Sequence, residues 1–533
     1  MKGLKKAVAV TLCAAMSVAA LNGCAFGKND ESAEEIERLE KKIGKLKDNV
    51  EELEGEVDRL KAENEILMEK NDELSDENDR LLAELNNEYD YNYNDNSSYW
   101  VSSSDRIYVD EDGNPIDLGG MEIIIRDWWS NPDSRYWPTN DYEEARMDYY
   151  EWLEETYNFK VVRTAISDWN TVPSDYVDYV TSGGDDNNYI FVLRKDAAVA
   201  SAMQEGLMYD LSTLDCLDFS FSMYRVNNSF RSYSQHGCIY SMATGYAEPG
   251  LGVYFNKSIL IDAGIDPDSI YQMQIDGKWN WDSFEDLLRT AQMDIDGDGE
   301  IDIFGLATNP TIMTQAAVYA NGGEFVGYSN GRYTCEVESA ATIEALEWVD
   351  SIYAKYKRQY YGWDEYQSDF ISGKAAFLVE YGYAGLENGW ITNNSYGSTN
   401  GNIGFVAFPS GNKVNGGEYY NYSEVNPVVI PACYDADRAW KIAFVWNLWS
   451  MDPPGYDGCN PYWSSYREGI FDQYINQTVD LMCHGCTIVN HSVMIPNLDV
   501  SSQLGYYIDG GGNAREMAAR AADEWQVYID AVN

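Results

Sequence analysis

The 533-residue chain has little positive charge and few histidines. It contains 37 Lys and Arg against 88 Asp and Glu, which gives a formal net charge of −51, and three His. A protein that binds a nucleic-acid backbone needs clustered Lys and Arg to neutralise the phosphates. The charge balance therefore excludes nucleic acid as a partner, and we interpret the excess of acid as a solubilising surface.

Motifs of several common catalytic sites are also missing. The chain has no His-Glu-x-x-His metal motif and no phosphate-cradling Gly-x-x-x-x-Gly-Lys-Ser/Thr loop. With 88 acids, some carboxylate pair will lie at the separation found in glycosidases by chance, so such a pair is no evidence for hydrolysis. We therefore expect a binding protein and not an enzyme.

The N-terminus carries an apolar run. Three lysines precede Ala7–Leu21, which is too short to span a bilayer, so residues 1–23 are predicted to be an export signal peptide. Leu21-Asn22-Gly23-Cys24 resembles a bacterial lipobox, which implies cleavage before Cys24 and lipidation of that residue, palmitate included. Residues 24–35 would then tether the protein to the extracytoplasmic face of the cell membrane. An ordinary signal peptide with an incidental cysteine is the alternative.

Residues 36–85 form a heptad array with two seam positions, which are apolar except for three Asn residues. One seam holds Ile36, Ile43, Val50, Val57, Asn64, Asn71 and Asn78, and the other holds Leu39, Leu46, Leu53, Leu60, Leu67, Leu74 and Leu81. β-Branched residues facing leucines favour a parallel two-stranded coiled coil, and seam Asn residues restrict it to a dimer. The pattern predicts a homodimeric stalk, followed by a flexible linker over residues 86–118. Because its flanks are acidic, the alternative is a single solvated helix or a helix that folds back onto another partner.

Strands and helices alternate from Gly119 onward. Met121–Ile125, Lys160–Thr164 and Tyr189–Leu193 read as strands, with an amphipathic helix at Tyr142–Tyr157 after the first of them. This alternation predicts a mainly parallel sheet, with ligands bound at the strand ends. The 42 Tyr and 16 Trp supply flat apolar faces that suit sugar rings, although most must lie in the core.

The most informative stretch is 250–307. It reads as a strand, a short helix closed by Gly264, a loop, a second helix with Asp282 as N-cap and Glu285 three residues on, an acidic loop, and a strand over Ile301–Ala307. The order resembles the carbohydrate-type extracellular solute-binding proteins (family 1) of ABC importers. The residues that carry the resemblance are Tyr254, Asn256, Lys257, Ala263, Gly264, Asn280, Trp281, Asp282, Phe284, Asp294–Gly299, Phe304 and Gly305, and it continues at Phe370–Phe377 and Ile403–Pro409.

The resemblance implies an α/β fold of two lobes, of the periplasmic-binding-protein type II. Lobe 1 is expected over residues 119–245 and 403–455, and lobe 2 over 246–402 and 456–533. It also implies a protein that captures a sugar or oligosaccharide by hinge closure and delivers it to an ABC permease. A dimeric cell-surface glycan sensor or adhesin on the same fold, not coupled to transport, is the alternative.

Candidate ligand-binding residues lie at the strand ends and lobe crossings. Indole rings can stack on a pyranose, and carboxylates accept hydrogen bonds from hydroxyls. The candidates are Trp128, Trp129, Lys195, Tyr246, Glu248, Trp363, Asp364, Glu380 and Tyr381. Trp281 is expected to lock a helix start against the sheet and not to touch ligand.

The loop at 294–302 resembles the first half of a calcium loop. Oxygen donors fall at the calcium-loop spacing, with Gly299 at the turn, and they are Asp294, Asp296, Asp298, Glu300 through its carbonyl, and Asp302. The bidentate Glu that should close the loop is replaced by Gly305. We expect no required cofactor and a weak structural calcium site, with a solvated acidic turn as the alternative.

Overall fold

The computed structural model describes most of the chain from residue 107 onward. The described residues run to 533 with gaps at 131–137, 139, 361–363, 387–388, 395–401, 423–424, 457–468, 471, 473 and 484–485; five more, between 41 and 59, are helical. The predicted signal peptide, Cys24, the predicted tether and nearly all of the predicted stalk lie outside the described residues. The chain divides into two compact units, Met1–Trp100 and Val101–Asn533. Among the described helices, none has the length and apolar character needed to cross a membrane.

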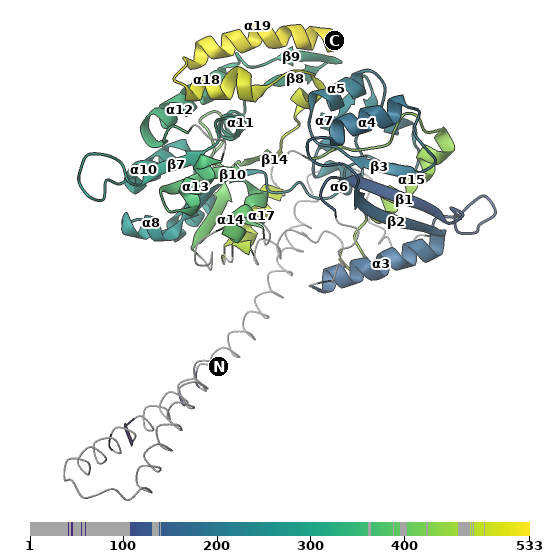
Figure 1. Ribbon diagram of the computed structural model, residues 1–533, viewed down its shortest axis with the longest axis horizontal. Coiled ribbons are helices and arrows are strands. Elements are labelled where there is room, and N and C mark those ends of the chain that lie inside the picture. The colour runs from purple at the N-terminus through teal and green to yellow at the C-terminus, as the bar shows by residue number, and fades with distance from the viewer. Residues whose placement is uncertain are drawn as a thin grey trace, which may run out of the picture. The chain divides into compact units, whose positions relative to one another are not determined.

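The first lobe contains a four-stranded sheet in the order β13-β3-β1-β2 (Figure 1). Its strands are β1 (Met121–Asp127), β2 (Phe159–Ala165), β3 (Asn188–Val192) and β13 (Val428–Val429). β1 pairs in parallel with β2 and β3, and β13 runs antiparallel to β3. The predicted mainly parallel sheet and its first three strands are confirmed.

Helices cover both faces of this sheet. α3 (Asp141–Tyr157) and α15 (Ala436–Trp449) pack on one face through residues such as Leu153 and Ile442, and α4 (Val172–Thr181) and α5 (Ala197–Gln204) pack on the other through residues such as Tyr176 and Met203. α3 begins at Asn140, whose side chain accepts the Glu143 N–H. Shorter elements of this lobe are η3 (Leu211–Thr213), α6 (Ser222–Arg225), α7 (Ser229–Ser232), β4 (Ser234–Gln235) and β5 (Cys238–Ile239).

The end of the expected linker belongs to the first lobe. Tyr108 packs edge-to-face on Phe444, with ring centroids 5.5 Å apart, and its N–H donates to the Tyr157 hydroxyl. Leu118 is buried in the same core. The prediction of a flexible linker up to 118 is therefore wrong for residues 108–118, because apolar side chains spaced through this polar stretch find places against α3 and α15.

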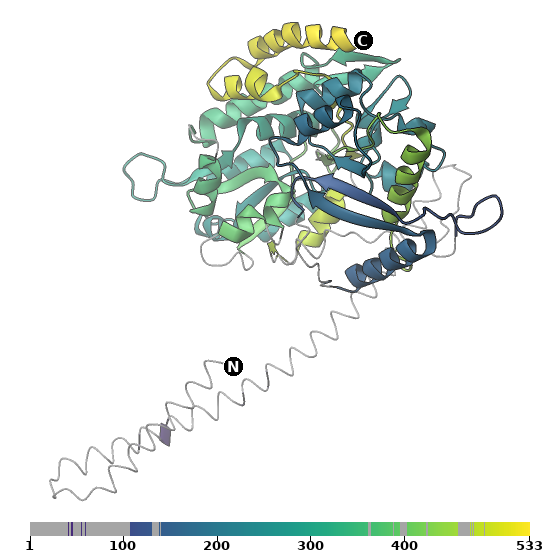
Figure 2. The same cartoon turned by 45° about the vertical axis from the view of Figure 1, so that its right-hand side comes forward.

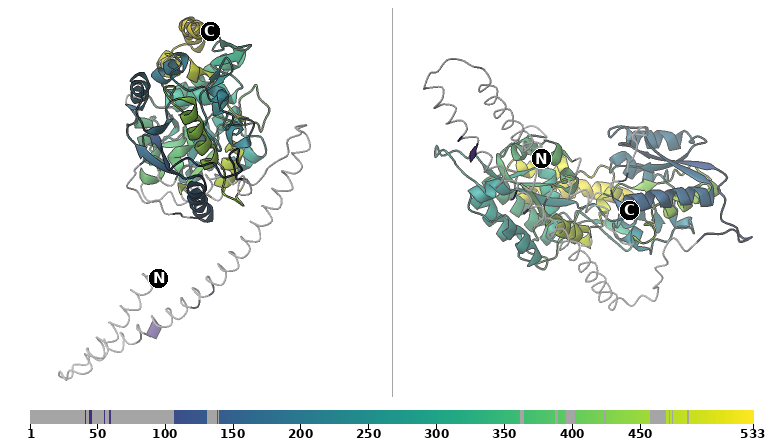
Figure 3. Two further views of the ribbon diagram at one scale, coloured as in Figure 1. Left: turned by 90° about the vertical axis from the view of Figure 1, so that its right-hand side faces the viewer. Right: turned by 90° about the horizontal axis from the view of Figure 1, so that it is seen from below.

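The second lobe, which lies beside the first in the right-hand view of Figure 3, contains a four-stranded mixed sheet in the order β11-β6-β10-β7. Its strands are β6 (Leu251–Asn256), β7 (Phe304–Thr308), β10 (Ala375–Tyr381) and β11 (Ile403–Ala407). β10 is parallel to β7, and β6 is antiparallel to both β10 and β11. Because β11 lies in this sheet, the predicted lobe boundary is wrong at 403–425. The return to the first lobe comes later, at β13.

The long helices of the second lobe are α10 (Trp281–Ala291), α11 (Pro310–Ala320), α12 (Ala340–Tyr356) and α19 (Ala514–Val532). α19 packs on α12 and β9, as expected for the C-terminal helix (Figure 1). The remaining elements are α8 (Lys257–Asp262), α9 (Asp268–Ile275), β8 (Val326–Ser329), β9 (Arg332–Cys335), α13 (Glu365–Ile371), η4 (Gly382–Gly385), α14 (Trp390–Asn394), β12 (Tyr420–Asn421), α17 (Ile475–Cys483), β14 (Cys486–Thr487), η5 (His491–Met494), η6 (Ser501–Gly505) and α18 (Tyr506–Asp509).

Two local predictions in this lobe had different outcomes. Gly264 has φ +77° just after α8, as expected for a glycine that closes a helix. The N-cap of α10 is Asn280 and not Asp282: the Asn280 side chain accepts the Ser283 N–H, and the Ser283 hydroxyl accepts the Asn280 N–H. This reciprocal pair is a capping box, so Asn280 is the N-cap and Trp281 is the first residue of the helix.

The crossing between the lobes at 245–250 is packed closely against a second crossing near Tyr422. The Gly250 N–H donates to the Asn421 side chain at 2.7 Å, and the Leu251 N–H donates to the Tyr422 carbonyl at 3.1 Å. A Cβ atom on Gly250 would lie 1.7 Å from the Tyr422 carbonyl oxygen. The two chain segments can therefore touch only because residue 250 has no side chain.

We expect the substitution Gly250→Ala to force these two segments apart and to lower the free energy of unfolding by about 1–3 kcal/mol. The matched control is Gly510→Ala, where a Cβ atom would meet its nearest neighbour at 3.4 Å. The control should shift stability by less than about 0.5 kcal/mol. Urea unfolding followed by tryptophan fluorescence measures both, and equal effects would contradict the proposed close approach.

Candidate functional site

Three tryptophans gather beyond the carboxyl end of the first sheet. Trp128 and Trp129 follow β1 and Trp169 follows β2, so neighbouring parallel strands deliver them to one edge. The Trp128 ring centroid lies 4.7 Å from that of Trp129 and 5.4 Å from that of Trp169, both edge-to-face. Trp129 is 52% exposed and Trp169 55% exposed. This tryptophan cluster presents two solvent-accessible indoles, whose flat faces can stack on a sugar ring.

A buried carboxylate holds the turn that carries the first two tryptophans. Asp127 is 1% exposed, and its Oδ1 accepts the N–H groups of Trp129 at 3.1 Å and of Ser130 at 2.8 Å. This is an Asx turn, in which a short side chain replaces a backbone acceptor. The position of Trp129 is therefore fixed through its own backbone.

Trp169 was not among the predicted site residues. Arg194 holds it: the Arg194 Nε donates to the Trp169 carbonyl at 2.7 Å, and the guanidinium carbon lies 5.0 Å from the indole centroid. Arg194 also forms a 2.9 Å ion pair with Asp196. Its position in the sequence could have indicated Trp169, because it follows β2 as Trp128 follows the neighbouring strand β1.

Lys195 lies at the same edge, as predicted. It follows β3, is half-buried, and precedes Asp196, the N-cap of α5. The Arg194 Nη1 donates to the Lys195 carbonyl at 3.2 Å. Its role in ligand binding stays a prediction.

The second lobe contributes an edge where three strands begin or end. β6 starts there, and β10 ends there because Tyr381 pairs with Leu251 in the antiparallel ladder. β7 also ends there, since it runs parallel to β10. The predicted residues on this edge are Tyr246 and Glu248, which precede β6, and Glu380 and Tyr381, which close β10.

Glu380 is a buried carboxylate that is held by neutral donors. It is 1% exposed; its Oε2 accepts the Tyr366 hydroxyl at 2.7 Å, and its Oε1 accepts the Tyr381 N–H at 2.9 Å. Burial raises the pKa of this carboxyl, and the hydrogen bonds oppose the rise. Because Glu380 is covered, it can shape the charge of the site more readily than it can touch a ligand. Tyr381 is more accessible and stacks on Tyr383, which is 47% exposed.

Glu248 is partly exposed, and no hydrogen bond or ion pair joins its carboxyl group to another described residue. Burial raises the pKa of this carboxyl from 4.5 to about 7. Burial and then the charges of Glu380 and Glu248 raise the pKa of the Tyr254 hydroxyl, so both carboxyls lie near that ring. An acceptor without a donor, at the lobe crossing, is suited to receive hydroxyl or ammonium groups of a ligand.

The last two predicted site residues, Trp363 and Asp364, precede α13. Trp363 lies outside the described residues. Asp364 is exposed, and its carbonyl oxygen accepts the N–H groups of Gln367 and Ser368 at the start of the helix. These contacts explain its place in the fold and leave its role in binding a prediction.

Trp281 is part of the core, as expected. It is 1% exposed and stacks on Trp348 with centroids 4.3 Å apart and planes 5° apart. Trp279 is fully buried and donates to the Ala407 carbonyl at 2.7 Å. Neither ring is accessible to a ligand.

A Gly-x-Ser-x-Gly pentapeptide at 327–331 does not form a hydrolase site. In hydrolases this motif makes a strained turn from a strand into a helix. Here it spans the end of β8 and the turn into β9, which pair as an antiparallel hairpin.

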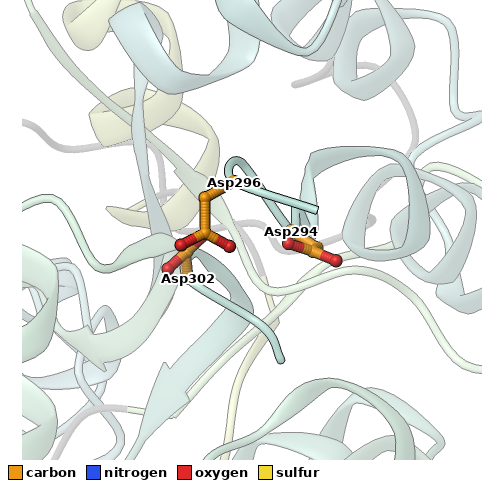
Figure 4. A group of neighbouring side chains, drawn as sticks. All are labelled: Asp294, Asp296 and Asp302. Atoms are coloured by element: carbon orange, nitrogen blue, oxygen red, sulfur yellow. The ribbon is translucent and has the colours of Figure 1, made fainter. Parts of the chain in front are cut away.

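The acidic loop between α10 and β7 projects from the second lobe (Figure 2). Carboxylate oxygens of Asp294, Asp296 and Asp302, all exposed, lie within 4.8 Å of one another (Figure 4). Asp298 and Glu300 are not in this group; the Asp298 carboxylate accepts the Glu300 N–H at 2.8 Å. Calcium binding here stays a prediction.

Comparison with known proteins agrees with this fold. The sequence model of a family of bacterial extracellular solute-binding proteins matches residues 147–453, more than half of the chain. None of the curated proteins matches the chain.

Solved structures with the same fold cover most of the chain. One is a sugar transporter protein from Rhizobium etli in an open conformation, with a TM-score of 0.54, 14% identity, and coverage of 78% of this chain and 100% of its own. Another is the GacH receptor of Streptomyces glaucescens, solved unliganded and with acarbose, with a TM-score of 0.50, 14% identity, and coverage of 77% and 99%. A third is a cyclo/maltodextrin-binding protein in complex with maltotetraose, with a TM-score of 0.50, 12% identity, and coverage of 78% and 98%.

Glu248 predicts a pH-dependent stability. Because burial raises the pKa of the Glu248 carboxyl from 4.5 to about 7, the folded protein holds this proton more tightly than the unfolded chain does. The stability that this difference contributes is complete below pH 4.5 and is lost as the pH rises through the folded-state pKa of about 7. Glu248→Gln should therefore stabilise the protein at pH 8.5 relative to wild type by about 1–2 kcal/mol, discounted for partial exposure, and should have no such effect at pH 4.5. Melting temperatures at the two pH values measure this. Asp262→Asn, at an exposed position of α8, is the control and should show no pH-dependent gain in stability.

The acidic loop predicts weak calcium binding. After chelation, 10 mM calcium should raise the melting temperature by about 1–2 °C, because millimolar affinity adds roughly 1 kcal/mol at that concentration. Asp296→Asn should abolish the shift, and Asp298→Asn, outside the carboxylate group, should keep most of it. A wild-type protein that does not respond to calcium would favour the solvated acidic turn.

Proposed function

The chain belongs to the bacterial extracellular solute-binding proteins, and we propose that it captures a sugar or oligosaccharide between its two lobes by hinge closure. The observation that carries this proposal is the tryptophan cluster at the carboxyl end of the first sheet. In α/β proteins ligands bind beyond the carboxyl ends of parallel strands. Exposed indoles are costly on a soluble surface unless a ligand covers them.

The second lobe supplies complementary chemistry. Its edge carries Glu248 and Tyr381, both accessible, and a carboxylate can accept hydrogen bonds from two neighbouring hydroxyls. A sugar offers both an apolar face for an indole and a rim of hydroxyls for a carboxylate. Binding of sugars by proteins of the same fold, among them the acarbose and maltotetraose complexes, supports this ligand class.

Three further parts of the proposal rest on the sequence and the family. Lipidation at Cys24 would hold the protein at the extracytoplasmic face of the membrane, and a parallel coiled coil over residues 36–85 would pair two copies. The closed form would deliver its ligand to an ABC permease. No catalytic step is proposed.

We expect a thermal-shift screen over neutral oligosaccharides to find a ligand. Calorimetry with that ligand should then show that Trp169→Ala or Trp129→Ala weakens binding by about 5- to 30-fold, because each indole contributes about 1–2 kcal/mol of stacking and burial. Phe221→Ala removes an exposed ring elsewhere on the first lobe and should leave affinity unchanged. A response to peptides or cations, with none to any glycan, would contradict the proposal.

A further inference from the structure

The ligand-facing edge of the second lobe has two carboxyl groups and no basic partner for either. Among the described residues, Glu248 has no side-chain partner, and Glu380 is hydrogen-bonded by the Tyr366 hydroxyl and the Tyr381 N–H. Glu380 pairs with Gly252 in the antiparallel ladder, four residues after Glu248, and the Tyr254 hydroxyl donates to the carbonyls of Tyr381 and Gly382 directly after Glu380. Two acids thus gather at one strand edge, and no basic side chain of the described residues is paired with either of them.

Among the described residues, the two basic side chains that lie beside β7 and α13 are already neutralised. Lys357, which bridges to Leu306 of β7, forms a 2.7 Å ion pair with Asp509, and both side chains are buried. Arg358 lies 3.0 Å from Asp369. These cations offer no compensation to the carboxyls and none to an anionic ligand.

The first-lobe edge shows a similar balance. Arg126 pairs with Asp175, Arg163 lies 3.9 Å from Asp127, and Arg194 lies 2.9 Å from Asp196. Lys195 is a further basic residue at this edge, and the variant Lys195→Met tests whether it affects the discrimination between neutral and anionic sugars. The neighbouring acids cancel most of the positive charge that the site could present to a ligand.

We propose that Glu248, with Glu380 behind it, selects the ligand by charge: the site takes neutral or amino sugars and rejects sugars that carry a carboxylate, sulfate or phosphate. This inference rests on the proposed function. Hydroxyl and ammonium groups can donate to the open Glu248 carboxylate, whereas an anionic group would bring a like charge to the same place. At the effective dielectric of a partly exposed site, such a repulsion lowers affinity about tenfold or more.

The surroundings of Glu248 are consistent with this role. Among the described residues, Glu380 and the Tyr254 hydroxyl lie near its carboxyl group. The Asn421 amide donates to the Glu248 carbonyl, and the Cys483 thiol donates to the neighbouring Ala247 carbonyl. None of them is a cation. Burial raises the pKa of the Glu248 carboxyl to about 7, so its charge, and with it the discrimination, grows as pH rises through neutrality.

The test uses the full-length protein and oligosaccharide pairs that differ by one group. Each neutral ligand found in the screen is compared by calorimetry at pH 8 with its C6-oxidised uronate and with its amino-sugar form. We expect the uronate to bind at least tenfold more weakly than the neutral ligand, and the amino sugar to bind at least as well. Glu248→Gln should reduce the uronate penalty at least threefold, whereas Asp262→Asn, which removes the same formal charge on α8, and Lys195→Met should not.

A second measurement protects the test against a variant that fails to fold. In the wild type, the affinity for the neutral sugar divided by the affinity for its uronate should fall at least threefold from pH 8 to pH 5.5. At pH 5.5 the uronate is still ionised, whereas the Glu248 carboxyl has taken up a proton. Neutral sugars that bind no better than uronates would overturn charge selection and leave the proposed function standing. Binding of no sugar of any charge would overturn both.

Discussion

The contact between Gly250 and Tyr422 is the constraint on which the two-lobed arrangement depends. Two chain segments that cross between the lobes approach so closely that residue 250 has no room for a Cβ atom. The Gly250 carbonyl also accepts the Gly382 N–H at 2.8 Å, directly after β10. One glycine therefore fixes the start of β6, the end of β10 and the second crossing against one another. The residues of the second-lobe edge, Glu248 and Tyr381, are placed by that same contact.

The two edges of the proposed site are built in different ways. On the first lobe, parallel strands end side by side, and buried Asp127 and ion-paired Arg194 hold exposed indoles in place. On the second lobe, an antiparallel pair brings the start of one strand beside the end of another and collects carboxyl groups. An apolar stacking surface and an acceptor-rich rim suit a ligand that has a flat face and many hydroxyl groups.

Much of this fold could be predicted from the sequence because its signals are local. Buried strands such as Met121–Asp127 and Leu251–Asn256 are short apolar runs between turns, and Gly264 ends its helix by a backbone need that only glycine meets easily. The helices α4 and α9 escaped notice because their apolar residues are mixed with Pro, Asp and Gln. The N-cap is Asn280 and not Asp282 because Asn280 and Ser283 form two reciprocal hydrogen bonds. The residue types alone do not show which of the two residues forms them.

The sequence by itself determined the family, the α/β alternation, the likeness of the acidic loop to a calcium loop, and the placing of Trp128, Trp129, Glu248 and Glu380 at strand ends. Only the tertiary structure assigned β11 to the second sheet, packed Tyr108 and Leu118 on the first lobe, and brought Trp169 against Trp128. It also showed that Glu380 is buried and that Glu248 is partly exposed. The physical reason is that strand pairing and burial join residues far apart in the chain, whereas sequence patterns report on neighbours within a few turns.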